Sequence, residues 1–473
     1  MEQVKSLVVA GLSGGSGKSV VTVGLVAALK HRGKGVAPFK KGPDYIDAGW
    51  MSRAAQRPCY NLDPYLMQPG TLVSTFQTHL DNVSFAVVEG NRGLFDGVNA
   101  MGEFSTAELA LLLDLPVLLV VNCSKVTRTA AAMVLGCQAL DPRVNFAGVI
   151  LNQIANSRHE TIIRQALAQA TDLPVLGVMP RLKKDIFPMR HLGVTPHQET
   201  SEADEVVERL GALVETRFDL DALIPRMRAI SPLPSVGATV PEGEEVTIGV
   251  LRDAAFQFYY EENLEALRLG GARLVTVDAL HTAELPPELD GLYIGGGFPE
   301  TSARLLSDNE SFRHSVRERA GQGLPIYAEC GGLIFLGRSL VIDDCEYPLA
   351  DVFPVTFGLS AKPQAHGYSA LVVERANSFY PLGTHIRGHE FRYSVVRRWD
   401  GEPEDLVFSV ERGTGLSDGR DGLVTHNVLA LYTHVMASGT PQWAPGFLAA
   451  ARNYAKRQGR AGIPARADAA GAG

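Results

Sequence analysis

The chain has 473 residues, of which 45% are hydrophobic and 20% are charged. These fractions are close to globular averages, so they exclude wholesale disorder and allow two or three domains of about 150 residues each. The formal net charge of −8 argues against a protein dedicated to binding nucleic acid. The apolar stretches at 7–10 and 109–121 are too short for a signal peptide and a membrane span, respectively. We therefore expect a cytoplasmic protein with neither a membrane nor a nucleic acid as partner.

Apolar segments in the first part of the chain predict strands that alternate with helices. A strand is expected at 4–10, followed by a Gly-rich turn and a helix at 18–31. Because the segments are continuously apolar, they predict a parallel sheet covered by helices on both faces. The expected fold class is α/β, an open and doubly wound sheet of the P-loop nucleotide-binding type. The other strands expected in this sheet are 35–40, 84–89, 116–122, 146–152 and 174–178.

The character of the sequence changes near residue 200. A charged amphipathic segment at 202–226 is followed by a polar, Pro-containing stretch at 231–245, which predicts a linker. A second doubly wound, mostly parallel α/β pattern then begins, with strands expected at 246–251, 273–277, 291–294 and 325–328. The predicted divisions are a first domain at 1–198, a helical segment and linker at 199–245, a second domain at 246–455 and a disordered tail at 456–473.

Residues Gly11 to Ser19 (GLSGGSGKS) form a Gly-rich loop between the first predicted strand and helix. Backbone N–H groups of such a loop converge on phosphate oxygens, and the helix N-terminus adds a favourable dipole. Lys18 can reach the β- and γ-phosphates, and the Ser19 hydroxyl can bind Mg²⁺. Leu12 stands where the common pattern has its first Gly, so the loop is one residue longer than usual. The candidate phosphate-binding residues are Gly11, Gly14, Gly15, Gly17, Lys18 and Ser19.

Two charged clusters follow the next strands of this pattern. In the segment 40–47 (KKGPDYID), Lys41 is a candidate for binding a phosphate or a carboxylate substrate, and Asp44 for binding Mg²⁺. A solvated charged turn is the alternative for this segment taken alone. The second cluster, 87–97, ends an apolar strand in Glu89, a further candidate Mg²⁺ ligand. Its glycines predict a loop that approaches a ligand closely.

The five cysteines are widely spaced and include no Cys-x-x-Cys pair, which argues against a disulfide scaffold or a structural zinc site. Cys330 lies between a predicted strand and an apolar helix, which is the arrangement of a nucleophile elbow, and the helix N-terminus favours its thiolate. Its base should be a histidine distant in sequence: His434 is best placed, and His426 and His389 are weaker alternatives. The other four cysteines are expected to be buried or incidental thiols: Cys59, Cys123, Cys137 and Cys345.

Glycines near Cys330 supply the candidate oxyanion site. A predicted strand ends in the run Gly295-Gly296-Gly297, whose backbone N–H groups are free to stabilise an oxyanion. Gly331 directly follows the candidate nucleophile. We expect Gly296, Gly297 and Gly331 to lie around the reacting carbonyl group.

The two sites together predict a glutamine-dependent amide synthetase. The thiol would attack the side-chain amide of glutamine and release ammonia. ATP would convert a substrate carboxylate to an acyl phosphate, because a free carboxylate has a poor leaving group, and ammonia would attack the carbonyl carbon of that acyl phosphate. The alternative from another class is a P-loop regulatory protein without glutaminase activity, against which the Cys330 elbow argues.

Over residues 4–450 the sequence resembles the cobyrinic acid a,c-diamide synthase family. In that family a dethiobiotin-synthetase-like ATPase domain is fused to a flavodoxin-like class I glutamine amidotransferase domain of the cobyric-acid-synthase type. The motifs that carry the resemblance lie at 11–19, 41–47, 61–63, 89–97, 148–152, 252–256, 295–300, 328–332 and 388–391.

The resemblance implies ATP and glutamine as co-substrates, Mg²⁺ as cofactor, and amidation of the a and c acetate groups of a tetrapyrrole. It makes Cys330 the glutaminase nucleophile and His434 its base. Met436 stands where ordinary class I amidotransferases carry a Glu, and the related cobalamin enzymes also lack that acid. The group that orients His434 is therefore unassigned. The resemblance adds Asn152 to the ATP site, and its candidate substrate-binding residues are Lys41, Tyr45, Asp47, Arg92 and Asp96.

The identity of the tetrapyrrole is left open by two departures from the family pattern, at Asn91-Arg92 and Ser13-Gly14-Gly15. Arg92 could hold an extra peripheral carboxylate of the ring. Cobyrinic acid is the leading substrate, and sirohydrochlorin or sirohaem is the alternative. The metal state of the ring, the order of amidation, the ammonia route and the oligomeric state, for which a homodimer is one alternative, are also left open.

Overall fold

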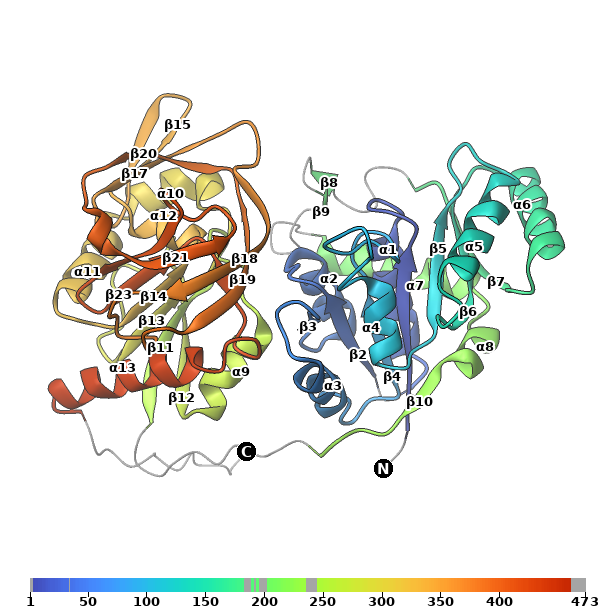
Figure 1. Cartoon of the computed structure of the whole chain (residues 1–473), viewed down its shortest axis with the longest axis horizontal. Helices are drawn as coiled ribbons and strands as arrows, with labels where there is room; N and C mark the ends of the chain where they lie inside the picture. The colour runs from blue at the N-terminus through green and yellow to red at the C-terminus, as the bar shows by residue number, and fades with distance from the viewer. Residues whose placement is uncertain are drawn as a thin grey trace. The chain divides into compact units, whose positions relative to one another are not determined.

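The computed structural model describes residues 3–33, 35–182, 189–190, 193–194, 202–234 and 245–460. The chain forms two compact units, Met1–Val236 and Gly237–Gly473, each with its own sheets and helices (Figure 1). The tail predicted to be disordered was placed at 456–473, but Lys456 and Arg457 belong to the helix Trp443–Arg457, and residues 461–473 lie outside the described residues. In the part of the chain that is described, no helix has the length and apolar character needed to cross a membrane.

The first unit is built on an eight-stranded sheet whose main strands are all parallel. Six of the strands correspond to the predicted ones, and their residues are largely Val, Leu and Ile buried on both faces. The three-residue strand β3 is too short to give a recognisable pattern. In spatial order the strands are β3 (Tyr60–Leu62), β2 (Val36–Lys41), β4 (Phe85–Glu89), β1 (Val4–Gly11), β5 (Val117–Asn122), β6 (Phe146–Ile154) and β7 (Val175–Pro180), while β10 (Arg228–Ile230) pairs antiparallel with β1.

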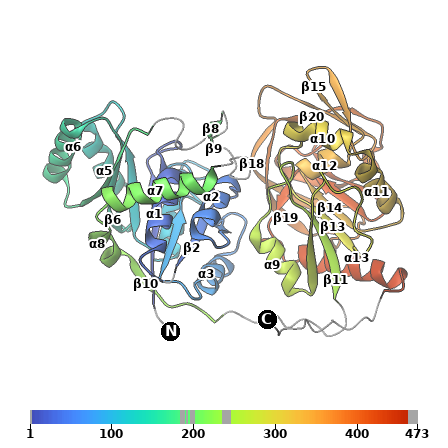
Figure 2. The ribbon, with the colours of Figure 1, turned by 180° about the vertical axis from the view of Figure 1, so that it is seen from behind.

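Helices cover both faces of this sheet. Helices α1, α2 and α7 lie on one face (Figure 2), and α4 and α5 lie on the other (Figure 1). The helices of the unit are α1 (Lys18–Lys30), α2 (Ile46–Ala55), α3 (Pro69–Thr78), α4 (Thr106–Leu112), α5 (Thr129–Leu140), α6 (Ser157–Ala170), α7 (Ala203–Arg217) and α8 (Leu220–Leu223), with a 3₁₀ turn η2 (Ile224–Arg226). A separate two-stranded ladder is formed by β8 (Met189–Arg190) and β9 (Gly193–Val194).

Helix α7 lies in the predicted helical segment and belongs to the core of the first unit, although the predicted first domain ended at residue 198. It packs closely along α1 because each helix has a Gly at the contact. A Cβ at Gly24 would lie 2.7 Å from Val214 Cγ2, and one at Gly211 would lie 2.9 Å from Ala27 Cβ. The apolar side of the amphipathic segment is therefore buried against α1.

The second unit contains a ten-stranded sheet that is parallel in one half and antiparallel in the other. The four predicted strands are β11 to β14 and are parallel, together with β23. The antiparallel strands that follow were not predicted. In spatial order the strands are β12 (Ala272–Val277), β11 (Val246–Leu251), β13 (Gly291–Ile294), β14 (Ile326–Glu329), β23 (Val428–Leu431), β22 (Arg420–Thr425), β21 (Leu406–Arg412), β18 (Ala365–Val373), β19 (His385–Arg392) and β24 (His434–Val435).

The antiparallel half curls back on itself. Strand β24 pairs with β19 at the far end of the sheet order, yet it follows β23, in the middle of the sheet, after only Tyr432 and Thr433. The curl therefore returns the chain to the carboxyl ends of the parallel strands. Strands β16 (Cys345–Pro348), β15 (Ser339–Ile342), β17 (Val355–Leu359) and β20 (Ser394–Trp399) form a further four-stranded sheet.

Helices also cover both faces of the large sheet of the second unit. Apolar residues of α9 and α13 share one core cluster, and those of α10, α11 and α12 share another. The helices are α9 (Glu261–Leu269), α10 (Ala303–Asp308), α11 (Glu310–Gly321), α12 (Gly331–Leu336) and α13 (Trp443–Arg457), with 3₁₀ turns η3 (Pro299–Ser302) and η4 (Pro403–Asp405).

Candidate active sites

The Gly-rich loop after β1 is braced by its own side chains and by β6. The Ser16 hydroxyl accepts from Ser13 N at 3.0 Å and donates to Ser13 O at 2.9 Å. Asn152 Nδ2 donates to Ser16 O at 2.8 Å. Gly17 begins α1 with a φ of 88°, and a Cβ there would lie 2.0 Å from Asn152 Nδ2. The structure therefore places Asn152 against the loop, where it fixes the backbone at Ser16 and Gly17.

Lys18 lies across this loop. Its Nζ donates to Ser13 O at 3.1 Å and to Arg92 O at 2.6 Å, so the side chain joins the loops that follow β1 and β4. Burial lowers the pKa of Lys18, and the nearby Lys40 ammonium lowers it further. An anion bound at the loop would relieve that repulsion.

A buried cluster of charges lies beside the loop, at the carboxyl ends of β2 and β4. Lys40 Nζ donates to Asp47 Oδ2 at 2.6 Å and to Glu89 Oε1 at 2.9 Å. Ser19 Oγ donates to the same Glu89 oxygen at 2.9 Å. Burial raises the pKa of Glu89 to about 7, although Lys40 acts in the opposite direction. For Lys40 burial acts to lower the pKa, but Asp47 and Glu89 raise it overall. Lys40 is therefore a charged residue of this site whose partners were not predicted.

The donor atoms of this cluster fit a magnesium ion. Glu89 Oε2 is buried and has no hydrogen-bond partner among the residues that the structure describes. With the Ser19 hydroxyl it offers the oxygen donors that Mg²⁺ prefers. The described residues contain no group of three or more His, Cys, Asp or Glu that could hold a metal ion.

At the end of β2 and in the segment after it, residues that were predicted to bind ligands are buried or partly buried, and one of them hydrogen-bonds the backbone. The Asp44 carboxylate accepts from the backbone N–H of Asp47 at 2.9 Å, and burial and the Asp47 charge raise its pKa to about 6. Asp44 thus caps the first turn of α2, which starts after Tyr45. Lys41 is only 5% exposed, and burial lowers its pKa. For Asp47 burial acts to raise the pKa, but Lys40 lowers it overall.

The loop after β4 carries the remaining predicted substrate residues. Arg92 has a φ of 50° and an exposed side chain, while its carbonyl oxygen accepts from Lys18. Asp96 Oδ2 accepts from Gly93 N at 2.8 Å, which closes the loop on itself. The structure therefore brings Arg92 next to the phosphate loop and gives Asp96 a role in shaping that loop.

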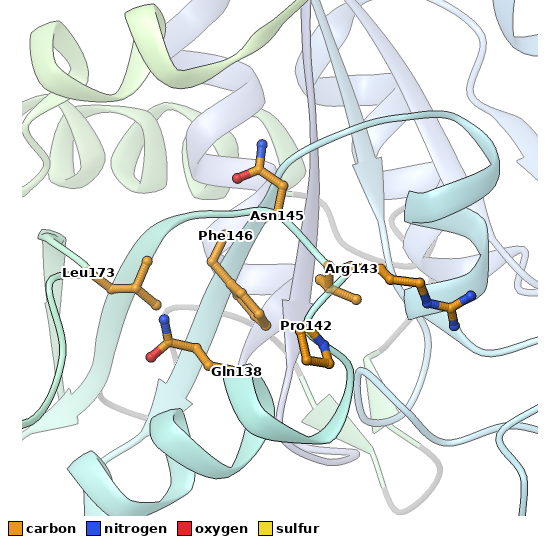
Figure 3. A pocket seen from close by; sticks show the side chains of 7 residues that line it. Gln138, Pro142, Arg143, Asn145, Phe146 and Leu173 are labelled. Carbon is orange, nitrogen blue, oxygen red and sulfur yellow. The ribbon is translucent and has the colours of Figure 1, made fainter.

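A pocket of about 420 Å³ in the first unit lies elsewhere (Figure 3). Its lining includes Gln138 on α5, Asn145 and Phe146 at the start of β6, and Leu173 before β7. These residues lie at the amino ends of the parallel strands, whereas the phosphate loop lies at their carboxyl ends. The pocket is therefore not part of the nucleotide site.

In the second unit Cys330 occupies a strained turn between β14 and α12. Its φ is 48° and its ψ is −98°, values that an L-residue adopts only where the surroundings impose them. The backbone N–H of Cys330 donates to Leu431 O at 2.8 Å, which continues the β14–β23 pairing into the turn. Cys330 Sγ is 3.9 Å from Phe391 O. This is the predicted elbow geometry.

Among the candidate histidines, His434 has a ring that hydrogen-bonds the Cys330 side chain. A Cβ at Gly296 would lie 2.4 Å from His434 Cε1, so the ring packs directly over that glycine. His389 lies opposite His434 in the β19–β24 ladder, with 6.4 Å between the ring centroids. His426 is exposed in the turn before β23, at the other end of the strand.

The glycines predicted for the oxyanion site lie beside the elbow, but not all of their N–H groups are free. Gly295 N donates to the Tyr259 hydroxyl at 2.9 Å and Gly296 N donates to Phe258 O at 3.2 Å, so the prediction was wrong for these two N–H groups. A Cβ at Gly331 would lie 3.0 Å from Gly297 N, which places that N–H next to the residue following Cys330. Gly297 has a φ of 159°, and a Cβ there would lie 2.0 Å from Ala255 O. Only glycine therefore allows the loop to approach Cys330 in this conformation.

Sequence reasoning missed Glu329 as a member of this site. Its Oε2 is 3.2 Å from His434 Nδ1, and its other oxygen accepts from Val435 N at 3.2 Å. Burial alone would lower the pKa of His434, but hydrogen bonds to Cys330 and Glu329 raise it to about 10. Glu329 is an acid at the end of an apolar strand, which is the pattern that identified Glu89, so the sequence contained a signal for it.

Comparisons with known proteins identify a domain in each unit. Residues 7–193 match the model of a CobQ/CobB/MinD/ParA nucleotide binding domain, and residues 247–442 match that of a CobB/CobQ-like glutamine amidotransferase domain. A Magnetococcus marinus protein named cobyrinate a,c-diamide synthase is 40% identical over 92% of this chain and 94% of its own length. The chain belongs to the cobyrinate a,c-diamide synthase family. Relatives of the same name from Dehalococcoides mccartyi and Archaeoglobus fulgidus are 37% and 38% identical, over 95% and 91% of this chain and 98% and 94% of theirs.

Membership in this family makes the chain a ligase of the glutamine amidotransferase type, with ATP and glutamine as substrates. The α/β fold of both units agrees with the two matched domains.

We expect Gly296→Ala to lower kcat for glutamine hydrolysis by about 100-fold, because the added methyl group overlaps the His434 ring and displaces it from Cys330. Release of glutamate measures the loss. Gly321→Ala is the matched control, since a Cβ there meets nothing within 4 Å. Unchanged activity in a folded Gly296→Ala protein would contradict the placement of the ring.

Proposed function

We propose that this protein uses ATP and glutamine to amidate the a and c acetate carboxylates of cobyrinic acid through acyl-phosphate intermediates. The observation that carries the proposal is a thiol–imidazole pair, Cys330 and His434, in the same chain as a phosphate loop with Lys18. The names of the relatives support the corrin substrate. ATP chemistry is assigned to residues 1–198 and glutamine hydrolysis to 246–455.

In the second unit Cys330 attacks the side-chain amide carbon of glutamine. His434 takes the thiol proton and returns it to the departing ammonia, which leaves a glutamyl thioester that water hydrolyses. The backbone N–H groups of Gly297 and Gly331 stabilise the oxyanion, and Gly296 provides room for the imidazole. Because the elbow holds the sulfur in a strained turn, the nucleophile is positioned before glutamine arrives.

In the first unit the loop from Gly11 to Ser19 binds the phosphates of ATP, and Lys18 stabilises charge on the transferred phosphoryl group. Ser19 and Glu89 would hold Mg²⁺, and Asp44 is the further predicted ligand. The bound ion would neutralise charge on the β- and γ-phosphate oxygens. The tetrapyrrole is assigned to residues around the same strand ends: Lys41, Tyr45, Asp47, Arg92 and Asp96. Exposed Arg92 is the cation available to a peripheral carboxylate of the ring.

The substrate assignment is tested by offering the purified protein cobyrinic acid, sirohydrochlorin and sirohaem in parallel, each with ATP, Mg²⁺ and glutamine. We expect cobyrinic acid to gain two amide groups, seen in the product mass, and to be consumed fastest. Faster diamidation of sirohydrochlorin or sirohaem would show that this ring, and not the corrin, is the preferred substrate. Failure to hydrolyse glutamine with any ring present would instead favour the regulatory alternative.

We expect Cys330→Ala to lower glutamine-dependent amidation more than about 1,000-fold, because no other nucleophile can form the thioester. Amidation with ammonium salts should be retained, since the first unit is untouched. Product formation with each nitrogen source provides the measurement, and Cys345→Ala, which removes an exposed thiol, is the control. Loss of both activities in the folded variant would show that the role of Cys330 is misassigned.

Lys18→Ala should lower amidation by about 100-fold or more with either nitrogen source, because the phosphoryl group loses its cation. Parallel assays with glutamine and ammonium salts measure both activities. Lys30→Ala, at the other end of α1, removes a lysine far from the loop and serves as the control. Retained synthesis in Lys18→Ala would refute the placement of the ATP site.

A further inference from the structure

We propose that Glu329 is the positioning residue of the glutaminase site: its carboxylate orients the His434 ring toward Cys330. This inference rests on the proposed glutaminase function of Cys330. It assigns a third member to the site at a place in the sequence where none was expected, directly before the nucleophile and 105 residues before the histidine.

The contacts of Glu329 are suited to this role. Oε2 faces His434 Nδ1 at 3.2 Å, and Oε1 accepts from the backbone N–H of Val435 at 3.2 Å. One carboxylate therefore holds both the ring and the strand that carries it. Glu329 and His434 are 1% and 2% exposed, so water does not compete for these hydrogen bonds.

The sheet explains how residues so far apart in sequence meet. Glu329 is the last residue of β14 and lies opposite Leu431 of β23 in the parallel register. Side chains alternate along β14, so Glu329 points to the same face as Tyr327, the face on which Val435 also packs. The curl of the sheet then returns the chain to this face at β24.

Two further buried side chains hold Glu329 and His434 in place. The Tyr293 hydroxyl hydrogen-bonds the Glu329 carboxylate and accepts from Asn263 Nδ2 at 3.2 Å. Asn263 also donates to Val435 O at 2.7 Å and accepts from Ala437 N at 2.7 Å. The network thus begins at the backbone around β24 and ends at the thiol. It rigidifies the histidine from both sides.

Position 436 cannot supply the orienting acid. Met436 is fully buried and apolar, and the groups whose charges act on His434 are Cys330 and Glu329. The neighbouring ring of His389 stacks at 6.4 Å and carries no negative charge. Glu329 is therefore the carboxylate that takes the place of the acid absent at 436.

The chemistry follows from which nitrogen of the His434 ring is hydrogen-bonded to the carboxylate. A carboxylate at Nδ1 keeps a proton on that nitrogen and leaves Nε2 to accept the thiol proton. Transfer of that proton gives a thiolate and an imidazolium, whose charge the carboxylate stabilises. The same proton then passes from Nε2 to the nitrogen of the departing ammonia, so the carboxylate itself is never protonated in the cycle.

The test follows the ring nitrogens of His434 by NMR on the full chain labelled with ¹⁵N-histidine, with His434→Gln identifying the resonance. In the unmodified protein we expect the Nδ1 proton to persist over the whole pH range and the His434 pKa to lie well above its ordinary value. Glu329→Gln should lower that pKa. Asp290→Asn, which alters a buried carboxylate at the other end of β13, should leave it unchanged.

Kinetics provide the second readout. Glu329→Gln should lower kcat for glutamine hydrolysis by at least about 100-fold with little change in KM, while ammonia-dependent amidation persists. An unchanged His434 titration or an unchanged kcat in the folded variant would overturn the inference. If the variant does not fold, the unmodified protein decides, because a neutral ring with its proton on Nε2 is incompatible with the proposed contact. The NMR measurement needs no substrate, so its outcome can be distinguished from a failure of the proposed glutaminase function.

Discussion

The pairing of β14 with β23 is the constraint on which the glutaminase site depends. This ladder places Glu329 opposite Leu431 and continues through the hydrogen bond from Cys330 N to Leu431 O at 2.8 Å. It thereby holds the nucleophile in a conformation with a φ of 48° that an isolated turn would abandon. It also brings the chain to within three residues of His434. A shift of one residue in this register would turn Glu329 away from the histidine.

Both units place buried charges where parallel strands end. Removing an ion from water costs several kcal/mol, so each such charge needs a partner. In the first unit Lys40 is matched by Asp47 and Glu89, and in the second Glu329 is matched by His434. The positions are equivalent in each sheet, because side chains at the carboxyl edge converge from several strands. The fold provides the convergence, and the residue types decide the chemistry.

Much of this arrangement could be predicted from local patterns. The phosphate loop with Lys18, the acid Glu89 and the elbow at Cys330 are each encoded within a few consecutive residues, as are the parallel strands that carry them. The antiparallel half of the second sheet was not predicted, and neither was the packing of α7 on α1. The pair Glu329–His434 was missed for the same reason: a contact across 105 residues depends on how the sheet curls, and local periodicity contains no information about that curl.

The hydrogen bonds of Lys18 have a consequence for nucleotide binding. Its long side chain is already tethered to Ser13 O and Arg92 O, so its rotamer entropy is lost on folding rather than on binding. A nucleotide must exchange those two carbonyl acceptors for phosphate oxygens, which are stronger partners for an ammonium group. Since the Arg92 carbonyl belongs to the loop after β4, that exchange would release a link between two loops. Nucleotide binding would thus change the loop after β4, at the edge of the sheet to which the acceptor substrate is assigned.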